Sequence, residues 1–78
     1  MEPVPAEVKR LIAEICGLDR ATLREDAKLV ACGMDSVRAM DLLVALEHAF
    51  SIEIPDDESF GLTTVADVID YVERKLEA

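Results

Sequence analysis

Residues 33–50, GMDSVRAMDLLVALEHAF, decide the fold, because they predict the most apolar helix of the chain. A glycine is followed by Asp35 and Ser36, residue types that favour the start of a helix, so we expect a helix over residues 35–50. Apolar residues fall on more than one side of it, whereas a surface helix needs a single stripe. The helix is therefore central to the core, presents apolar side chains to a partner, or both.

Helical periodicity also marks the two ends of the chain. We predict a first helix over residues 5–16, closed by Gly17, and a last helix over residues 64–76, opened by Thr64 and Asp67 at capping-box spacing. Their apolar stripes consist of Val8, Leu11, Ile12 and Ile15 in the first, and Val65, Val68, Ile69, Val72 and Leu76 in the last. Each helix has one face to bury against a common core.

The connections complete the predicted architecture. Residues 18–33 form a long connection, and loops of that length without structure of their own are often functional. Residues 56–61 are at most a short helix. We therefore expect an all-α fold, a small bundle of three main helices and one short one, in a single domain over residues 1–78.

The charge balance restricts the classes of partner. The chain of 78 residues has 17 acidic and 8 basic side chains and a formal net charge of −9. Such a surface repels nucleic-acid phosphates and attracts basic protein surfaces. The same charge is also consistent with nothing more than a soluble, self-repelling surface.

The sequence gives no sign of export or membrane insertion. Cys16 and Cys32 are not spaced as a metal or redox pair, so we expect two reduced, half-buried thiols. Neither a basic-then-apolar leader nor an apolar run of about 20 residues is present. These features predict a cytoplasmic location.

Ser36 is the one candidate for chemistry. Serine at a helix start is usually only a cap, and as a nucleophile it would need a base within hydrogen-bond reach. The single histidine, His48, lies twelve residues further along the same helix, which is about 18 Å away. The sequence therefore argues against a serine hydrolase acting in cis. A hydroxyl at this place is well suited to modification by another enzyme, because a phosphodiester would face free N–H groups.

Residues 26–50 resemble the core signature of acyl carrier proteins, D-x-x-L-x-x-L-G-x-D-S-L followed by a helix ending in L-E-x-x-F. The matching positions here are Asp26, Leu29, Gly33, Asp35, Ser36, Leu46, Glu47 and Phe50. Residues 8–17, 50–55 (FSIEIP) and 63–72 (TTVADVIDYV) resemble other parts of the same family. The resemblance covers nearly the whole chain.

The resemblance implies the chemistry. A phosphopantetheinyl transferase, using coenzyme A and Mg²⁺, would attach 4′-phosphopantetheine to Ser36, beside Asp35, and the terminal thiol would carry acyl groups as thioesters. The chain itself would be a monomer without catalytic residues or a metal site. Its partners would be the transferase and acyl-loading and synthase enzymes with basic docking patches.

Two further sets of residues follow from this expectation. The predicted docking surface consists of Val37, Arg38, Met40, Asp41, Val44, Glu47 and His48 on the second helix. The predicted acyl pocket consists of Leu29, Cys32, Leu42, Leu46, Ile54 and Tyr71. For Met40 and Val44, ordinary core packing is the competing interpretation.

Departures from the family pattern bear on the pathway. Arg38 stands where carriers of fatty-acid synthesis usually have an acid, and Cys32 stands where leucine is usual. These features favour a specialised, polyketide-type carrier over one of housekeeping fatty-acid synthesis. The alternatives are a peptidyl carrier and an unmodified helical interaction module. A calcium loop over residues 56–67 fails, because Phe60 occupies a ligand position.

Overall fold

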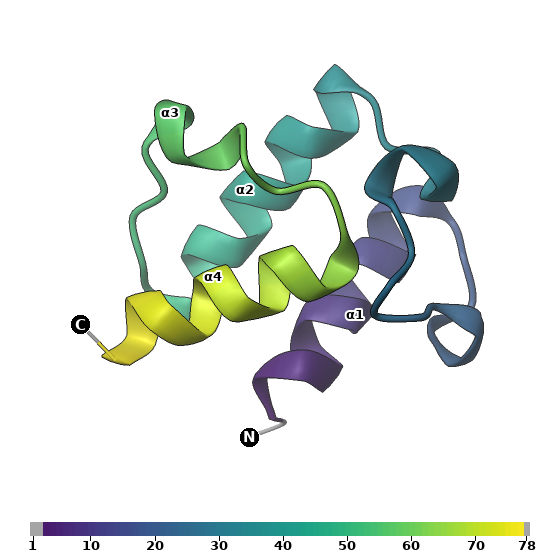
Figure 1. Cartoon of the computed structure of the whole chain (residues 1–78), viewed down its shortest axis with the longest axis horizontal. Helices are drawn as coiled ribbons and strands as arrows, with labels where there is room; N and C mark the ends of the chain where they lie inside the picture. Colours follow the sequence, from purple (N-terminus) through teal and green to yellow (C-terminus); the bar gives the residue numbers. More distant parts are fainter. Residues whose placement is uncertain (1–2, 78) are drawn as a thin grey trace.

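The computed structural model describes residues 3–77 and has the predicted helical architecture (Figure 1). The elements in chain order are α1 (Val4–Cys16), two 3₁₀ helices η1 (Arg20–Thr22) and η2 (Leu29–Cys32), α2 (Ser36–Phe50), α3 (Asp56–Ser59) and α4 (Val65–Glu77). The main helices agree with the predicted ranges to within one residue at each end. Helix α3 ends two residues earlier than the predicted range.

Local sequence explains where α1 ends and where α4 begins. Gly17 adopts φ 70° after α1, and its N–H bonds to the carbonyl of Ala13, as a left-handed C-cap requires. Before α4, Asp67 Oδ2 accepts the N–H of Thr64 at 3.0 Å, and Thr64 Oγ1 accepts the N–H of Asp67 at 3.1 Å. The predicted capping box is confirmed, with aspartate in place of glutamate.

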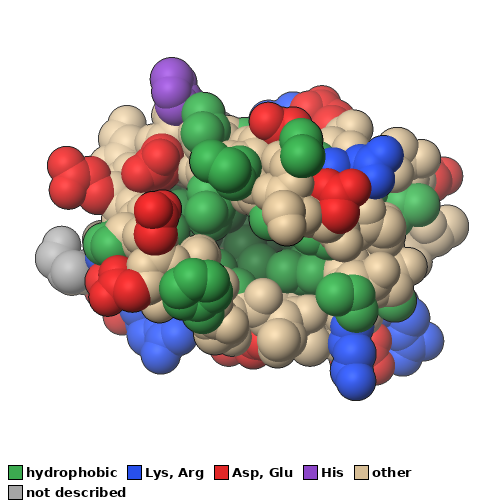
Figure 2. Space-filling model, turned by 90° about the horizontal axis from the view of Figure 1, so that it is seen from above, with side chains coloured by type: hydrophobic (Ala, Val, Ile, Leu, Met, Phe, Trp, Pro, Cys, Tyr) green, Lys and Arg blue, Asp and Glu red, His purple; other side chains and the backbone are tan. Residues whose placement is uncertain are grey.

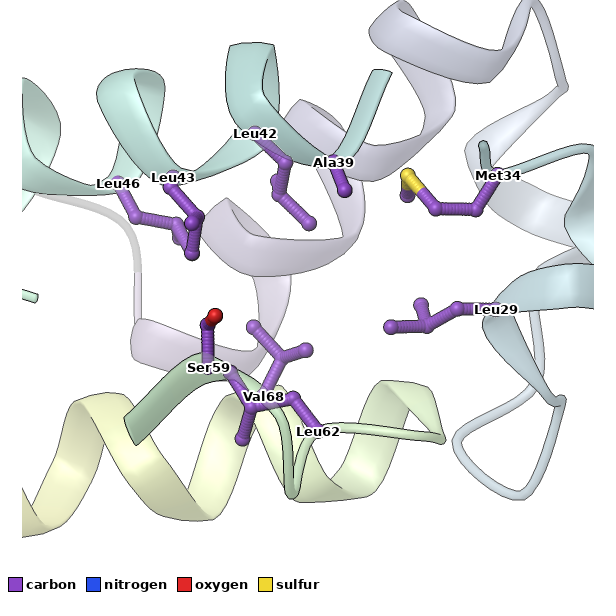
Figure 3. Close-up of a pocket in the computed structure, with 9 residues that line it drawn as sticks. All are labelled: Leu29, Met34, Ala39, Leu42, Leu43, Leu46, Ser59, Leu62 and Val68. Atoms are coloured by element: carbon purple, nitrogen blue, oxygen red, sulfur yellow. The ribbon is translucent and has the colours of Figure 1, made fainter. Parts of the chain in front are cut away.

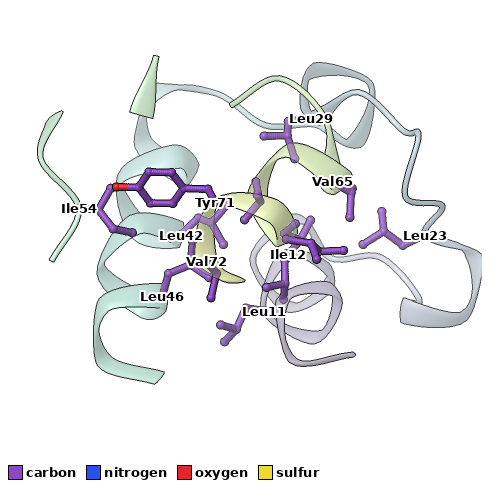
Figure 4. Packing of buried hydrophobic residues seen from close by; sticks show 13 residues of the cluster. Leu11, Ile12, Leu23, Leu29, Leu42, Leu46, Ile54, Val65, Tyr71 and Val72 are labelled. Atoms are coloured by element: carbon purple, nitrogen blue, oxygen red, sulfur yellow. The ribbon is translucent and has the colours of Figure 1, made fainter. Parts of the chain in front are cut away.

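The core lies where α1, α2 and α4 meet (Figure 4). Each of the three helices contributes fully buried side chains, and the largest are Val8, Ile12, Leu46, Val65, Val68 and Val72. Leu23 and Leu29 add to the core from the connection between α1 and α2. No helix within residues 3–77 is long and apolar enough to cross a membrane.

The connection from α1 to α2 is more ordered than the sequence indicated. It contains η1 and η2, and backbone hydrogen bonds fasten it to the start of α4: Leu29 N–H to Thr63 O at 2.8 Å and Val65 N–H to Ala27 O at 3.0 Å. Lys28 and Thr64 form an isolated antiparallel bridge at the same place. Because of this attachment, the chain enters α2 from a fixed position.

Candidate functional site

The turn before α2 is held by a small set of hydrogen bonds. Asp35 is the N-cap, and its Oδ1 accepts the N–H of Arg38 at 2.8 Å. The Arg38 guanidinium reaches back and donates to the Gly33 carbonyl at 3.0 Å and to Asp35 Oδ2 at 3.4 Å. Gly33 adopts φ 91°, which disfavours any side chain there. The backbone around Ser36 is thus pre-arranged.

Ser36 is the first residue of α2, and its side chain is exposed. Its hydroxyl makes no hydrogen bond with any part of the described chain, so it is available to a modifying enzyme. His48 is exposed in the last turn of the same helix, far from Ser36, which confirms that the chain's single histidine is not a base for this serine.

An apolar cavity of about 80 Å³ lies between α2 and the segment that carries α3 and the start of α4 (Figure 3). Its lining residues are Leu29, Met34, Ala39, Leu42, Leu43, Leu46, Ser59, Leu62 and Val68. An engineered cavity of roughly 150 Å³ is enough to bind benzene in another protein, so this one accommodates only a smaller group as it stands.

Two open spaces of similar size meet at Ser36. The first, which we call the vestibule, has about 550 Å³ and is lined by Lys28, Leu29, Val30, Met34, Asp35, Ser36, Ala39, Leu62 and Thr63. The second, which we call the α3 groove, has about 540 Å³ and is lined by Ser36, Ala39, Met40, Leu43, Val44, Glu47, Ile54, Asp56, Ser59 and Phe60. Figure 2 shows a hollow with hydrophobic side chains at its floor on the face at the top of Figure 1.

The predicted docking residues lie along α2, and most of them are exposed. The apolar ones are Val37, Met40 and Val44, which are 71%, 68% and 53% exposed; Arg38, Asp41 and His48 are exposed as well. Core packing, the competing interpretation for Met40 and Val44, is thereby excluded. Glu47 differs, because it is half-buried and its Oε2 accepts the N–H of Ile54 at 3.0 Å. That carboxylate fixes the turn after α2.

The predicted pocket residues separate into two groups. Leu29, Leu42 and Leu46 line the cavity together. Ile54 lines the α3 groove, and Cys32 packs half-buried against the core. Tyr71 has a buried ring, but its hydroxyl donates to Glu58 Oε1 at 2.6 Å at the surface.

Three residues of the site were not predicted from the sequence. Phe60, just after α3, is 83% exposed and continues the apolar surface of Met40 and Val44 across the α3 groove. Met34 and Leu62 line both the cavity and the vestibule. The signal for Phe60 was available, since a lone aromatic in a short acidic segment has no core face to occupy.

Within residues 3–77, the cysteines and acids form no second reactive centre. Burial raises the pKa of the Cys16 thiol, with a smaller contribution from Cys32, so Cys16 stays protonated and unreactive at neutral pH. Both cysteines are free thiols. Among residues 3–77, no three His, Cys, Asp or Glu side chains are grouped so as to hold a metal ion.

The described chain is a small helical bundle that presents an exposed serine at the start of its most apolar helix, an arrangement that suits modification by another enzyme. Comparison with known proteins agrees. The model of the family described as phosphopantetheine attachment site matches residues 6–72, and the chain belongs to that family. The crystal structure of an acyl carrier protein from Thermotoga maritima is similar, with a TM-score of 0.79 and 33% identity, over 92% of this chain and 85% of that one.

Members of this family carry the attachment site for covalent phosphopantetheine, and the family together with the fold supports a role as an acyl carrier. When bound, the group supplies a thiol that holds acyl units as thioesters. The site fits such a group, since Ser36 has an exposed, unbonded hydroxyl and open space on two sides. As an acyl carrier, the chain interacts with a phosphopantetheinyl transferase and with synthase enzymes.

Proposed function

We propose that Ser36 is the attachment residue and that the chain is a free-standing, monomeric carrier without catalysis of its own. The observation that carries this proposal is the exposed Ser36 hydroxyl, which has no base beside it and lies where the vestibule and the α3 groove meet. Asp35 and Arg38 support the same role, because they hold the turn in one conformation for a modifying enzyme. The location that we propose for the carrier is the cytoplasm.

The docking surface in this proposal extends beyond α2. Val37, Met40, Val44 and Phe60 supply exposed apolar area, and Asp41 and Asp56 lie close to them in sequence or on the same groove. Apolar area with acids at its edge suits a partner with a hydrophobic contact site surrounded by Lys and Arg. We expect the transferase and the synthases to share this surface.

The pathway proposed is a specialised, polyketide-type synthesis. Arg38 supports it, since this residue replaces the acid usual in fatty-acid carriers and makes its own hydrogen bond to the Gly33 carbonyl. The small cavity gives independent support, because about 80 Å³ suits a short acyl unit better than a long alkyl chain.

Tandem mass spectrometry on the chain purified from its own cells tests both statements. The arm is expected on the peptide that contains Ser36, and the acyl group released from it identifies the pathway. An aminoacyl group would instead support a peptidyl carrier. A chain found only unmodified, in cells with an active transferase, would support an interaction module.

A further inference from the structure

We propose that the phosphopantetheine arm lies in the vestibule, with its phosphodiester against the ammonium group of Lys28, and not in the α3 groove. The inference rests on the proposed function, in which Ser36 carries the arm. Beyond the proposed function, the inference assigns Lys28 the role of positioning the phosphodiester, and it assigns the arm a course across the surface.

Size does not distinguish the two spaces that meet at Ser36. They have about 550 Å³ and about 540 Å³, and both include Ala39 in their walls. Each therefore offers enough room for the first part of an arm attached to Ser36. The choice between them must depend on what else lines them.

Charge does distinguish them. The charged residues that line the α3 groove are Glu47 and Asp56, two carboxylates. Those that line the vestibule are Lys28 and Asp35, and the Asp35 carboxylate already has the Arg38 guanidinium beside it at 3.4 Å. A phosphodiester is an anion at neutral pH, so the α3 groove repels it, whereas Lys28 attracts it.

Lys28 is also held in the right place. Its backbone is fastened to the start of α4 by the bridge to Thr64, and its carbonyl accepts the N–H of Ala31 at 3.0 Å. Its exposed side chain makes no hydrogen bond or ion pair with any residue from 3 to 77. A fixed backbone with an uncommitted ammonium group can reach into the vestibule that begins at Ser36.

Arg38 is the other cation close in sequence, and it does not compete for this role. Residues two apart on a helix do not face each other, so Arg38 points away from Ser36. Its guanidinium is already bonded to Gly33 and Asp35, and it lines neither the vestibule nor the α3 groove.

The floor of the vestibule fits the next part of the arm. Leu29, Met34, Ala39 and Leu62 line both the vestibule and the cavity, so the two spaces share apolar walls. The second carbon after the phosphodiester in pantetheine carries two methyl groups, which would lie on this apolar floor. An arm placed here therefore leads toward the cavity between α2 and α4.

Amide chemical shifts of the apo and holo chains test the proposal without any assay of acyl transfer. Beyond the neighbours of Ser36, we expect attachment to shift the amides of residues 28–30 and 62–63. In Lys28→Ala these shifts should fall about two- to five-fold, the range that loss of an exposed ion pair allows. Lys28→Arg should retain them. Arg74→Ala, which removes an exposed cation of α4 away from Ser36, should retain them as well.

Two results would overturn the inference: shifts concentrated at residues 40–44 and 56–60, or no shifts beyond the turn around Ser36. If the shifts at residues 28–30 and 62–63 persist in Lys28→Ala, Lys28 does not position the phosphodiester. The intact mass of each sample shows whether the arm is attached, which tests the role of Ser36 separately from the course of the arm. Lys28→Ala is expected to accept the arm as completely as the wild type. Failure of the wild type to accept it would instead defeat the role of Ser36.

Discussion

The Tyr71 hydroxyl donates a hydrogen bond of 2.6 Å to Glu58 Oε1, which joins α4 to the four-residue helix α3. Lys75 reinforces the contact, with its Nζ 3.1 Å from the same oxygen and 5.6 Å from the centre of the Tyr71 ring. The bond from Tyr71 lowers the pKa of Glu58, while burial, followed by Glu58 itself, raises the pKa of Tyr71. Ser59 and Leu62, which line the cavity, lie just beyond this contact.

Tyr71→Phe should loosen α3 while leaving the bundle folded. The substitution keeps the buried ring and removes only the hydroxyl that holds Glu58, so the core packing is unchanged. Hydrogen exchange of amides 56–62 should become several-fold faster, with no change in the middle of α1 or α4. Equal exchange rates in the two proteins would show that α3 is held by other contacts.

Leu46→Ala should be strongly destabilising, whereas Val44→Ala on the same helix should not. Leu46 is fully buried and already borders the cavity, so its truncation enlarges a void and costs about 2–5 kcal/mol. Val44 is 53% exposed, and its truncation should change stability by no more than about 0.5 kcal/mol. Urea unfolding of the two variants measures the contrast. Similar midpoints would contradict the orientation of α2.

Asp67→Asn should weaken the start of α4 in a pH-dependent way. The Thr63 hydroxyl, at 2.8 Å, and the N–H groups of Thr63 and Thr64, at 3.0 Å each, lower the pKa of Asp67 from 3.8 to about 2. A lowered carboxyl pKa stabilises the fold above the unfolded value, and this contribution is lost as pH falls through the folded value. The wild type should therefore have the higher urea midpoint at pH 7, and its advantage should shrink between about pH 4 and pH 2.

Asp70→Asn is the matched control for that experiment. Asp70 is an exposed carboxylate on the same helix and accepts no hydrogen bond from residues 3–77. Its removal should leave the midpoint at pH 7 unchanged or raise it, because the chain has a net charge of −9. A loss equal to that of Asp67→Asn would assign the effect to charge alone and not to the cap.

Met40→Ala and Phe60→Ala should slow modification by the transferase without unfolding the carrier. Both side chains are largely exposed, so their loss removes contact area from a partner and not from the core. For the more important contact of the two we expect about a five-fold or larger fall in kcat/KM. Leu76→Ala, which truncates a 47% exposed residue on α4, should have no effect. Unchanged kcat/KM in all three variants would show that the transferase contacts a different surface of the carrier.

The main helices could be predicted because their causes are local. The stripe from Val8 to Ile15, the Gly17 cap and the Thr64–Asp67 box depend on residues within a few positions of one another. The 3₁₀ helix η2 was not predicted, because the bond from Leu29 N–H to Thr63 O joins segments far apart in the sequence. Sequence periodicity contains no information on such a contact.

The site was predictable to a similar extent. The position of Ser36 at a helix start, and its distance from His48, follow from helical spacing alone. Glu47 was assigned to the outer face of α2, yet the turn at Ser51, with φ 54°, brings the N–H of Ile54 back to its carboxylate. Likewise, the hydroxyl of Tyr71 meets Glu58 only because α3 folds against α4. Tertiary contacts decide these positions.

The most direct test of the central claim is the intact mass of the folded chain after incubation with coenzyme A, Mg²⁺ and a broad-specificity phosphopantetheinyl transferase. Wild type and Ser59→Ala, a serine control whose hydroxyl bonds the Asp56 carbonyl, should each gain one phosphopantetheine, and Ser36→Ala should gain none. Folded wild type that gains nothing, or Ser36→Ala that gains the same mass, would contradict the account.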